Sequence, residues 1–369
     1  MRVLFTSPAL FGEEGVYGGG ERYALGLARA VARELGGATL YAAGAQTREL
    51  REGQLRIAVR QPRFFVRGQP SNPFPRGLWP EIAEADVVHC FQQHIALTSV
   101  ALLMARARGI PVFATDLGGG GWDISSYVDT SRWFTGLLHL SAFAAKVAGR
   151  EADARDAVLL GGIDATYAQT RRRSPAPGVT GTVLFVGRFF PHKGPDVLLE
   201  AADPSWDVVI CGRAQDDRYL ADLRRLAQGK RVTFVMSASD EELDAQYSRA
   251  AVVVVPSVGK DRYGGTTNVP ELLGLVALEA AAHGVPVVAS DVASLPEIVE
   301  HGATGLLVPP GDAGALRDAV GSLLKDPVRR AVMAGKARQR VVERFSWKAA
   351  GETAIGAYRR AIALSAGAA

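Results

Sequence analysis

Cysteine is scarce in this chain: only Cys90 and Cys211 occur among its 369 residues. Both lie in short apolar runs, where a free cysteine behaves as a small buried hydrophobic side chain. Two such residues exclude the disulfide frameworks of small secreted domains and favour a reducing compartment.

Long hydrophobic runs are also missing. The run of β-branched residues Val252–Val255 is far shorter than the roughly 20 apolar residues of a membrane-spanning helix. The first residues form a short strand pattern with no long apolar segment behind it, so no signal peptide is predicted. We therefore expect a cytoplasmic protein, and peripheral contact with the inner face of the membrane stays open.

The sequence lacks a strong excess of charge of either sign. Its 42 basic and 38 acidic residues give a net charge of +4, which is too small to predict a nucleic-acid partner. The cluster Arg171–Arg173 lies among prolines and a glycine and is interpreted as a solvated linker. Cysteine and histidine are too few for a zinc site, and no Asp-x-Asp pattern is present, so no metal or other cofactor is expected.

Short apolar runs alternate with stretches of helical period, which is typical of βαβ units and parallel sheets. The clearest helix is expected at Glu21–Glu34, and three helical stretches are expected from about Asp312 to the end. The predicted strands fall into two series: Val3–Thr6, Ala38–Ala42, Val87–Cys90, Val112–Thr115, Leu137–Leu140 and Val158–Leu160, then Thr182–Val186, Asp207–Ile210, Arg231–Val235, Val252–Val255, Pro286–Ala289 and Gly305–Val308. We predict two doubly wound α/β domains at 1–170 and 181–347, joined by a linker at 171–180, with a C-terminal helix at 348–369 that packs back on the first domain.

A strand-to-helix loop in the second series carries two cations. Gly187–Gly194 follows the strand Thr182–Val186 and precedes a helical stretch, and it contains Arg188 and Lys193. The guanidinium fork, the ammonium group and the unpaired N–H groups of the following helix suit a diphosphate. Two solvated surface cations are the alternative.

Two glutamates lie eight residues apart at the next candidate site. Glu279 lies in the apolar helical run Leu275–Ala282, where a carboxylate needs a hydroxyl or cationic partner. Glu271 comes just before this helix, and the unpaired N–H groups at the start of a helix favour an anion at that place. Taken alone, this spacing is weak evidence for a site, and a solvated loop glutamate together with a structural salt bridge is the favoured explanation.

These motifs occur together in an order that resembles the family 4 (group 1) glycosyltransferases of the retaining type. The resemblance rests on Gly187 to Gly194, Pro256-Ser257, Glu271 to Glu279, His283–Ser290, Pro296-Glu297 and Gly302–Val308, with looser matches in the first half. It implies a GT-B fold, in which two Rossmann-like doubly wound domains face each other across a cleft. It also implies transfer of a sugar from a nucleotide diphosphate to a hydroxyl group.

The resemblance assigns roles to the second half of the chain. Arg188 and Lys193 look like ligands of the donor diphosphate, Glu279 like the carboxylate that holds the ribose, and Glu271 like the catalytic acidic residue at the donor sugar. Backbone N–H groups of Gly274 and Leu275 would contact the phosphate and sugar, and the nucleobase would pack near Ser237. The sequence departs from the family where Leu272 replaces the first glycine of the usual Glu-Gly-Phe-Gly loop, and where the long segment 258–269 precedes it.

In the first half, Gly18, Gly19 and Gly20 lie between a strand and a helix, where glycines let the backbone approach a donor phosphate or sugar. Similar enzymes often carry a histidine after the fourth strand, and this chain has Asp116 at that place. Asp116 is taken as a catalytic candidate, with a turn-capping role as its alternative. His89 and His94 are further candidates, for which structural roles are favoured.

The resemblance thus implies a hexosyltransferase that uses a nucleotide sugar, UDP- or GDP-linked, and with no metal site in the sequence we expect it to be metal-independent. The acceptor would be a glycan, a glycolipid or another hydroxyl compound in bacterial polysaccharide or glycoconjugate synthesis. The departing phosphate oxygen would take the acceptor proton, with Asp116 as the alternative base. Two alternatives remain: a non-catalytic GT-B subunit that binds nucleotide sugar or glycan, and a nucleotide-sugar epimerase.

Overall fold

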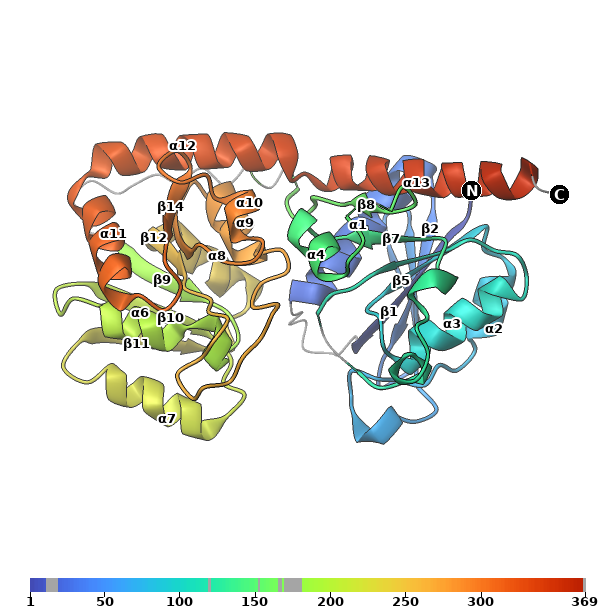
Figure 1. Ribbon diagram of the computed structural model, residues 1–369, viewed down its shortest axis with the longest axis horizontal. Coiled ribbons are helices and arrows are strands. Elements are labelled where there is room, and N and C mark those ends of the chain that lie inside the picture. The colour runs from blue at the N-terminus through green and yellow to red at the C-terminus, as the bar shows by residue number, and fades with distance from the viewer. Residues whose placement is uncertain (11–18, 119–120, 152, 165–167, 169–180, 368–369) are drawn as a thin grey trace. The chain divides into compact units, whose positions relative to one another are not determined.

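The computed structural model describes residues 1–10, 19–118, 121–151, 153–164, 168 and 181–367 (Figure 1). The chain divides into two compact units, each described here by itself. The first consists of Met1–Gly161 and Trp347–Ala369, and the second of Gly162–Ser346. The division comes before the predicted linker 171–180, which lies outside the described residues.

The first unit is built on an eight-stranded sheet in the order β3-β4-β2-β1-β5-β6-β7-β8. All neighbouring strands are parallel except β3 and β4, which form an antiparallel pair at one edge. Its strands are β1 (Val3–Leu10), β2 (Ala38–Ala43), β3 (Arg48–Glu52), β4 (Leu55–Arg60), β5 (Val87–Phe91), β6 (Val112–Thr115), β7 (Gly136–His139) and β8 (Ala157–Val158). Its helices are α1 (Gly19–Leu35), α2 (Leu78–Ala83), α3 (Ala96–Arg106), α4 (Ala142–Val147) and α13 (Trp347–Gly367), with 3₁₀ turns η1 (Val66–Gly68), η2 (Ile124–Ser126) and η3 (Ser131–Trp133).

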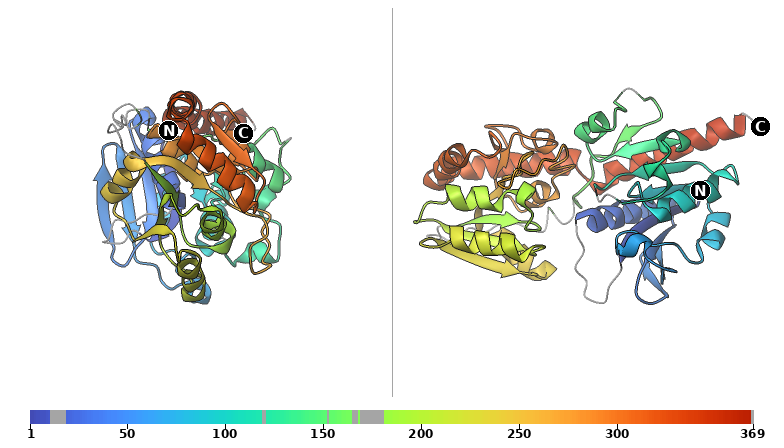
Figure 2. Two further views of the ribbon diagram at one scale, coloured as in Figure 1. Left: turned by 90° about the vertical axis from the view of Figure 1, so that its left-hand side faces the viewer. Right: turned by 60° about the horizontal axis from the view of Figure 1, so that its bottom comes forward.

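The second unit is built on a six-stranded, fully parallel sheet in the order β11-β10-β9-β12-β13-β14. Helices lie on both faces of the sheet in each unit, as the views in Figure 2 show. Its strands are β9 (Thr182–Val186), β10 (Asp207–Gly212), β11 (Arg231–Met236), β12 (Ala250–Val255), β13 (Val287–Ser290) and β14 (Gly305–Val308). Its helices are η4 (Pro191–Lys193), α6 (Pro195–Ala201), α7 (Asp217–Leu226), α8 (Asp240–Arg249), α9 (Leu275–Ala282), α10 (Leu295–Ile298), α11 (Ala313–Lys325) and α12 (Pro327–Arg344).

Successive residues of a central strand serve opposite faces of the first sheet, because side chains alternate along a strand. On β5, Val88 and Cys90 belong to the core cluster that includes residues of α2 and α3. His89, from the other face, contacts the ring of Tyr358 on α13. Helix α13 also contacts α1, where Gly26 leaves room for the indole of Trp347. The end of the chain is therefore an integral part of the first unit.

The predicted α/β architecture with two Rossmann-like sheets is confirmed, and the predicted strands recur with small shifts in their ends. The three predicted helical stretches at the end of the chain are α11, α12 and α13. Strands β3 and β4 are not among the predicted strands. The charged strand β3 is mostly exposed at the sheet edge and so shows no apolar alternation. Within the described residues, every helix is too short or too polar to cross a bilayer.

Candidate functional site

The loop between β9 and α6 places Lys193 at the carboxyl edge of the second sheet. The turn ends at Gly194, which has φ +69°, a conformation that favours glycine. A Cβ atom at Gly194 would lie 2.1 Å from the carbonyl oxygen of Pro256, so the loop packs directly on the segment that follows β12. The backbone N–H of Val258 donates to the carbonyl of His192, which joins the two segments further.

Lys193 and Glu271, predicted as phosphate and sugar ligands, are bonded to each other. The ammonium Nζ lies 2.7 Å from Oε2 of Glu271 and donates to the carbonyl of Pro270 at 3.0 Å. Both side chains are mostly buried, with exposed fractions of 23% and 17%. Ser294 Oγ donates to the carbonyl of Glu271 at 3.1 Å and fixes the backbone of this loop. A cation and a carboxylate thus lie side by side in a partly enclosed place.

Arg188, the second predicted phosphate ligand, is exposed on the same loop. Its guanidinium lies 4.9 Å from the ring centre of Phe190, which stacks on His192. Burial lowers the pKa of His192, and Lys193 and Arg188 lower it further by charge repulsion, although Glu271 opposes them. The cations of this loop and its burial therefore favour the neutral form of the His192 imidazole.

Glu279 has the hydroxyl partner that its apolar surroundings require. Tyr247 on α8 donates its phenolic O–H to Oε2 of Glu279 at 2.7 Å. The ring of Tyr247 stacks on His283 at 4.8 Å between ring centres. Nε2 of His283 lies 2.8 Å from Oδ1 of Asp244, and its Nδ1 lies 2.8 Å from the carbonyl of Glu279. This network joins α8 to α9 and holds the carboxylate in place.

The remaining predicted donor residues of the second unit lie at element ends. Gly274 is the N-cap of α9 with φ +83°, and Leu275 is the first residue of that helix. A Cβ atom at Gly274 would lie 3.0 Å from Leu295, so this turn also packs closely on α10. Ser237 follows β11 with φ +57°, is exposed, and donates its N–H to the carbonyl of Gly212.

Asp116 is exposed after β6, and its Oδ1 accepts from the N–H of Gly118 at 3.2 Å. That contact is the turn-capping alternative named above, and it leaves the carboxylate at the surface. Gly19 and Gly20 are the first residues of α1, whereas Gly18 lies outside the described residues.

His89 has a structural environment, as expected. It is fully buried between Tyr358 and Thr115, with 2.6 Å from Nδ1 to the phenolic oxygen and 2.8 Å from Nε2 to Oγ1. Burial lowers its pKa to about 3, so the ring is neutral.

The structure brings Lys193 and Glu271 into contact and places Gly274 in the same loop. Sequence reasoning predicted a hydroxyl or cationic partner for Glu279 but did not identify Tyr247, which lies 32 positions earlier in the chain. No local signal marks it, because the contact arises from the packing of two helices.

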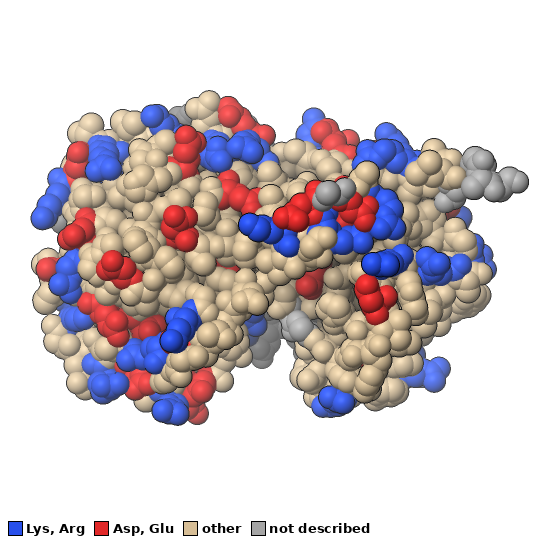
Figure 3. All heavy atoms as spheres, in the orientation of Figure 1, with Lys and Arg blue, Asp and Glu red and all other residues tan. Residues whose placement is uncertain are grey.

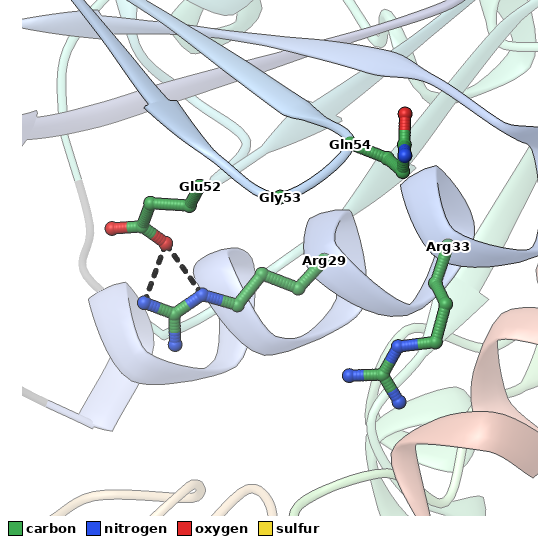
Figure 4. A pocket seen from close by; sticks show the side chains of 5 residues that line it. All are labelled: Arg29, Arg33, Glu52, Gly53 and Gln54. Carbon is green, nitrogen blue, oxygen red and sulfur yellow. Dashed lines mark hydrogen bonds and ion pairs between the residues drawn. The ribbon is translucent and has the colours of Figure 1, made fainter.

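A pocket in the first unit is lined by Arg29, Arg33 and residues 52–54 (Figure 4). Arg29 binds Glu52 through Nε at 2.6 Å. Gln54 directly precedes β4, which places the pocket at the amino edge of the sheet. Ligands of such sheets bind at the carboxyl edge, whereas this pocket lies at the opposite edge of its own sheet.

Residues 167–340, which lie within the second unit, match the family model of the group 1 glycosyl transferases. A D-inositol 3-phosphate glycosyltransferase of Corynebacterium glutamicum is 36% identical over 215 residues, covering 55% of this chain and 49% of the relative. One of Corynebacterium aurimucosum is 38% identical over 216 residues, covering 55% and 48%. The chain thus spans about half the length of the curated relatives it matches.

Solved structures resemble the whole chain at low identity. A sucrose-phosphate synthase from Thermosynechococcus elongatus has a TM-score of 0.71 and 21% identity, covering 98% of this chain and 99% of that one. HepE of Anabaena in complex with UDP and glucose has a TM-score of 0.68 and 19% identity, covering 96% and 98%. The fold is that of the GT-B glycosyltransferases, as predicted. The group 1 match falls on the second unit, and the matched segment includes both Lys193 and Glu271.

Proposed function

We propose that this protein is a glycosyltransferase that moves a sugar from a nucleotide diphosphate to a hydroxyl acceptor. The observation that carries the proposal is the pairing of Lys193 with Glu271 at the start of α9, on a loop that also holds Arg188. A diphosphate needs the cations and a sugar needs the carboxylate, and the two are adjacent here. The group 1 match over 167–340 supports the same function.

In the proposed reaction the configuration at the anomeric carbon is retained and no metal takes part. Arg188, Lys193 and the N–H groups at the start of α9 stabilise the negative charge that grows on the leaving diphosphate. Glu271 orients the hydroxyl groups of the donor sugar, and Glu279, held by Tyr247, binds the ribose. Glu271 leaves its ion pair with Lys193 when the diphosphate enters, since the anion competes for the same ammonium group.

The donor is proposed to be a UDP- or GDP-linked sugar. The structural neighbour HepE was solved with UDP and with UDP-glucose, which makes UDP-glucose the first donor to test. The curated relatives are named for D-inositol 3-phosphate, so this compound is the first acceptor to test. A glycan or lipid-linked acceptor in bacterial cell-surface synthesis is the other class we propose. Basic and acidic side chains are interspersed on the face in Figure 3, and peripheral membrane contact stays a proposal.

The proposal is tested by the thermal stability of the protein with UDP, GDP, ADP and dTDP, in buffer with EDTA. One nucleotide should raise the melting temperature of the wild type, and Arg188→Ala and Glu279→Ala should abolish this rise. Arg231→Ala is the matched control, because Arg231 is an exposed cation of the same unit that pairs with Asp207. If all four nucleotides leave the melting temperature unchanged, or only a metal restores the shift, the donor site as proposed is wrong.

A non-catalytic GT-B subunit is the second candidate, because the loop Glu271–Gly274 lacks the usual first glycine and Asp116 replaces a histidine. Such a subunit binds nucleotide but releases none from nucleotide sugars. An epimerase would convert the donor without an acceptor. Product analysis of UDP-glucose incubated with and without D-inositol 3-phosphate separates the three functions.

A further inference from the structure

The segment after β5 contains two non-glycine residues in the left-handed region. Gln92 has φ +73° and His94 has φ +60°. Such conformations are strained for residues with a side chain and persist where the surroundings enforce them. Gln92 is buried, whereas the imidazole of His94 is exposed.

This strained segment lies at the topological switch point of the first sheet. The order β4-β2-β1-β5-β6-β7 runs outward in two directions from the β1–β5 pair, so the chain reverses its direction of winding between these two strands. In open parallel sheets, ligands bind beyond the carboxyl ends of the strands at this point. His94 follows the carboxyl end of β5, and Asp116 follows that of the neighbouring β6.

The surroundings that enforce the strain come from the loop after β6. A Cβ atom at Gly121 would lie 2.4 Å from the carbonyl oxygen of His94, so glycine lets the two backbones touch. Asn72, which is fully buried, clamps the same loop: its Nδ2 donates to the carbonyl of Trp122 at 2.8 Å, and its Oδ1 accepts from the N–H of Ala96 at 2.8 Å.

A hydrogen-bonded chain fixes the proton on the His94 ring. The carboxylate of Asp123 is buried, and its two oxygens accept from the hydroxyls of Ser125 and Ser99. An ionised carboxylate only accepts, so the Ser125 proton points to Asp123 and its oxygen is left to accept. Nδ1 of His94 lies 2.7 Å from that oxygen and must therefore carry the ring proton.

In the neutral form of the ring, Nε2 of His94 is therefore the nitrogen without a proton. Among the described residues it has no hydrogen-bond partner, and the ring is exposed. Glycosyl acceptors react through hydroxyl groups, which donate hydrogen bonds to such a nitrogen.

We propose that His94, oriented by Ser125 and Asp123, binds the acceptor by accepting a hydrogen bond at Nε2 from an acceptor hydroxyl. The inference rests on the proposed transferase function and adds to it a hydroxyl-binding acceptor site in the first unit. The ligand class is a polyhydroxylated compound, such as a sugar or cyclitol. His94 contacts the substrate, whereas Ser125 and Asp123 are positioning residues that act through it.

The geometry is tested first without any ligand, by ¹⁵N NMR of histidine-labelled full-length protein. The neutral His94 ring, identified by its loss in His94→Asn, should be protonated at Nδ1. In Ser125→Ala it should shift towards the Nε2-protonated form. Ser126→Ala is the control, because Ser126 is an exposed neighbour that is not a member of the hydrogen-bonded series His94–Ser125–Asp123. Protonation at Nε2 in the wild type would overturn the proposal, whatever the protein does with nucleotides.

The role is tested by UDP release from UDP-glucose with D-inositol 3-phosphate as the probe acceptor, and with water alone. His94→Asn suits this test because asparagine tolerates the left-handed backbone. It should keep the wild-type shift in melting temperature with UDP but lower acceptor-dependent release about tenfold, the effect of losing about one hydrogen bond. In His94→Gly, added imidazole should restore part of the loss, which a purely structural role would not allow.

Full activity of His94→Asn would overturn the acceptor role. Failure of the wild type to bind UDP would instead contradict the donor site in the second unit, and the tautomer measurement would still decide the geometry at His94. The two failures are therefore distinguishable.

Discussion

Glu271 has a different partner before and after donor binding, if the proposed function holds. Its carboxylate is bonded to Lys193 without ligand, and we propose that it holds the donor sugar afterwards. Its contribution to nucleotide affinity should therefore differ in sign from its contribution to turnover.

We expect Glu271→Gln to bind UDP as tightly as the wild type or more tightly, because Lys193 is released from its ion pair. Turnover of UDP-glucose should fall roughly ten- to a hundredfold, since a hydrogen bond to a charged group contributes about 1.5–3 kcal/mol. Calorimetric titration and UDP release measure the two effects. Glu300→Gln, at an exposed carboxylate of the same unit, should change neither. Equal losses of affinity and turnover would show that Glu271 serves only the loop structure.

Tyr247 gives a second prediction, because its hydroxyl holds the carboxylate of Glu279. In Tyr247→Phe the carboxylate loses one hydrogen-bond donor, a bond worth about 1.5–3 kcal/mol. Only part of this free energy should appear as weaker binding of UDP. The affinity for UDP should fall several-fold, with a smaller change in the maximal rate. Tyr263→Phe removes an exposed hydroxyl that also bonds a carboxylate, that of Asp222, and is the matched control. A control that loses as much affinity would argue against a positioning role.

Because His89 is buried, we expect the stability of the first unit to fall in acid. Its pKa is lowered to about 3 by burial, from an ordinary value of 6.5. Between these values the unfolded chain holds a proton that the folded unit does not, so stability is fully present above about pH 6.5. It is lost as the pH falls towards about 3, by up to roughly 1.4 kcal/mol per pH unit.

Calorimetric unfolding between pH 7 and pH 4 tests this dependence. His89→Gln should be less stable at pH 7, because it disturbs the contacts with Tyr358 and Thr115, but should lose less stability on acidification. His301→Gln, at an exposed histidine, should follow the wild type. Parallel curves for all three proteins would contradict the prediction.

At the scale of elements, the turn between β9 and α6 depends on one glycine. Gly194 and Gly229 have similar left-handed φ values of +69° and +75°. A Cβ atom at Gly194 would lie 2.1 Å from the carbonyl of Pro256, whereas one at Gly229 would have open space. The two positions thus separate backbone strain from steric collision.

Gly229→Ala should destabilise the second unit by about 1–2 kcal/mol, the cost of a left-handed alanine. Gly194→Ala should cost more, because the loop must also move away from Pro256, and it should weaken UDP binding by displacing Lys193. Denaturant unfolding and UDP titration provide the measurements. Equal destabilisation of both variants would show that the loop relaxes freely.

For the whole molecule, the two units differ in how the chain builds them: one is a single segment and the other is made of two. The second is the continuous segment Gly162–Ser346, whereas the first needs α13 from the end of the chain. Helix α13 supplies Tyr358, which is fully buried against His89 and Phe113.

We expect a fragment of residues 162–346 to fold alone and bind UDP, and a fragment of residues 1–161 to remain unfolded or aggregate. Adding a peptide of residues 347–369 to the latter should restore cooperative unfolding, as monitored by circular dichroism. Wild-type-like unfolding of residues 1–161 alone would contradict the proposed dependence on α13.

Much of the candidate site in the second unit could be predicted from the sequence, because its residues lie on short segments with recognisable spacing. Lys193, Glu271 and Gly274 are examples. The ion pair between the first two could not be predicted, since it joins segments 78 positions apart. The same holds for Tyr247 and Glu279, which meet through helix packing.

The sequence by itself determined the α/β class, most of the strands and the cationic loop at 187–194. Apolar period and turn residues are local properties, and so they can be seen in a linear chain. Only the tertiary structure decided which contacts join α13 to the first unit, such as that of Tyr358 with His89, and that Lys193 and Glu271 pair with each other. It also decided that Asp123 and Ser125 set the proton on His94, because contacts between residues distant in the chain depend on how the elements pack.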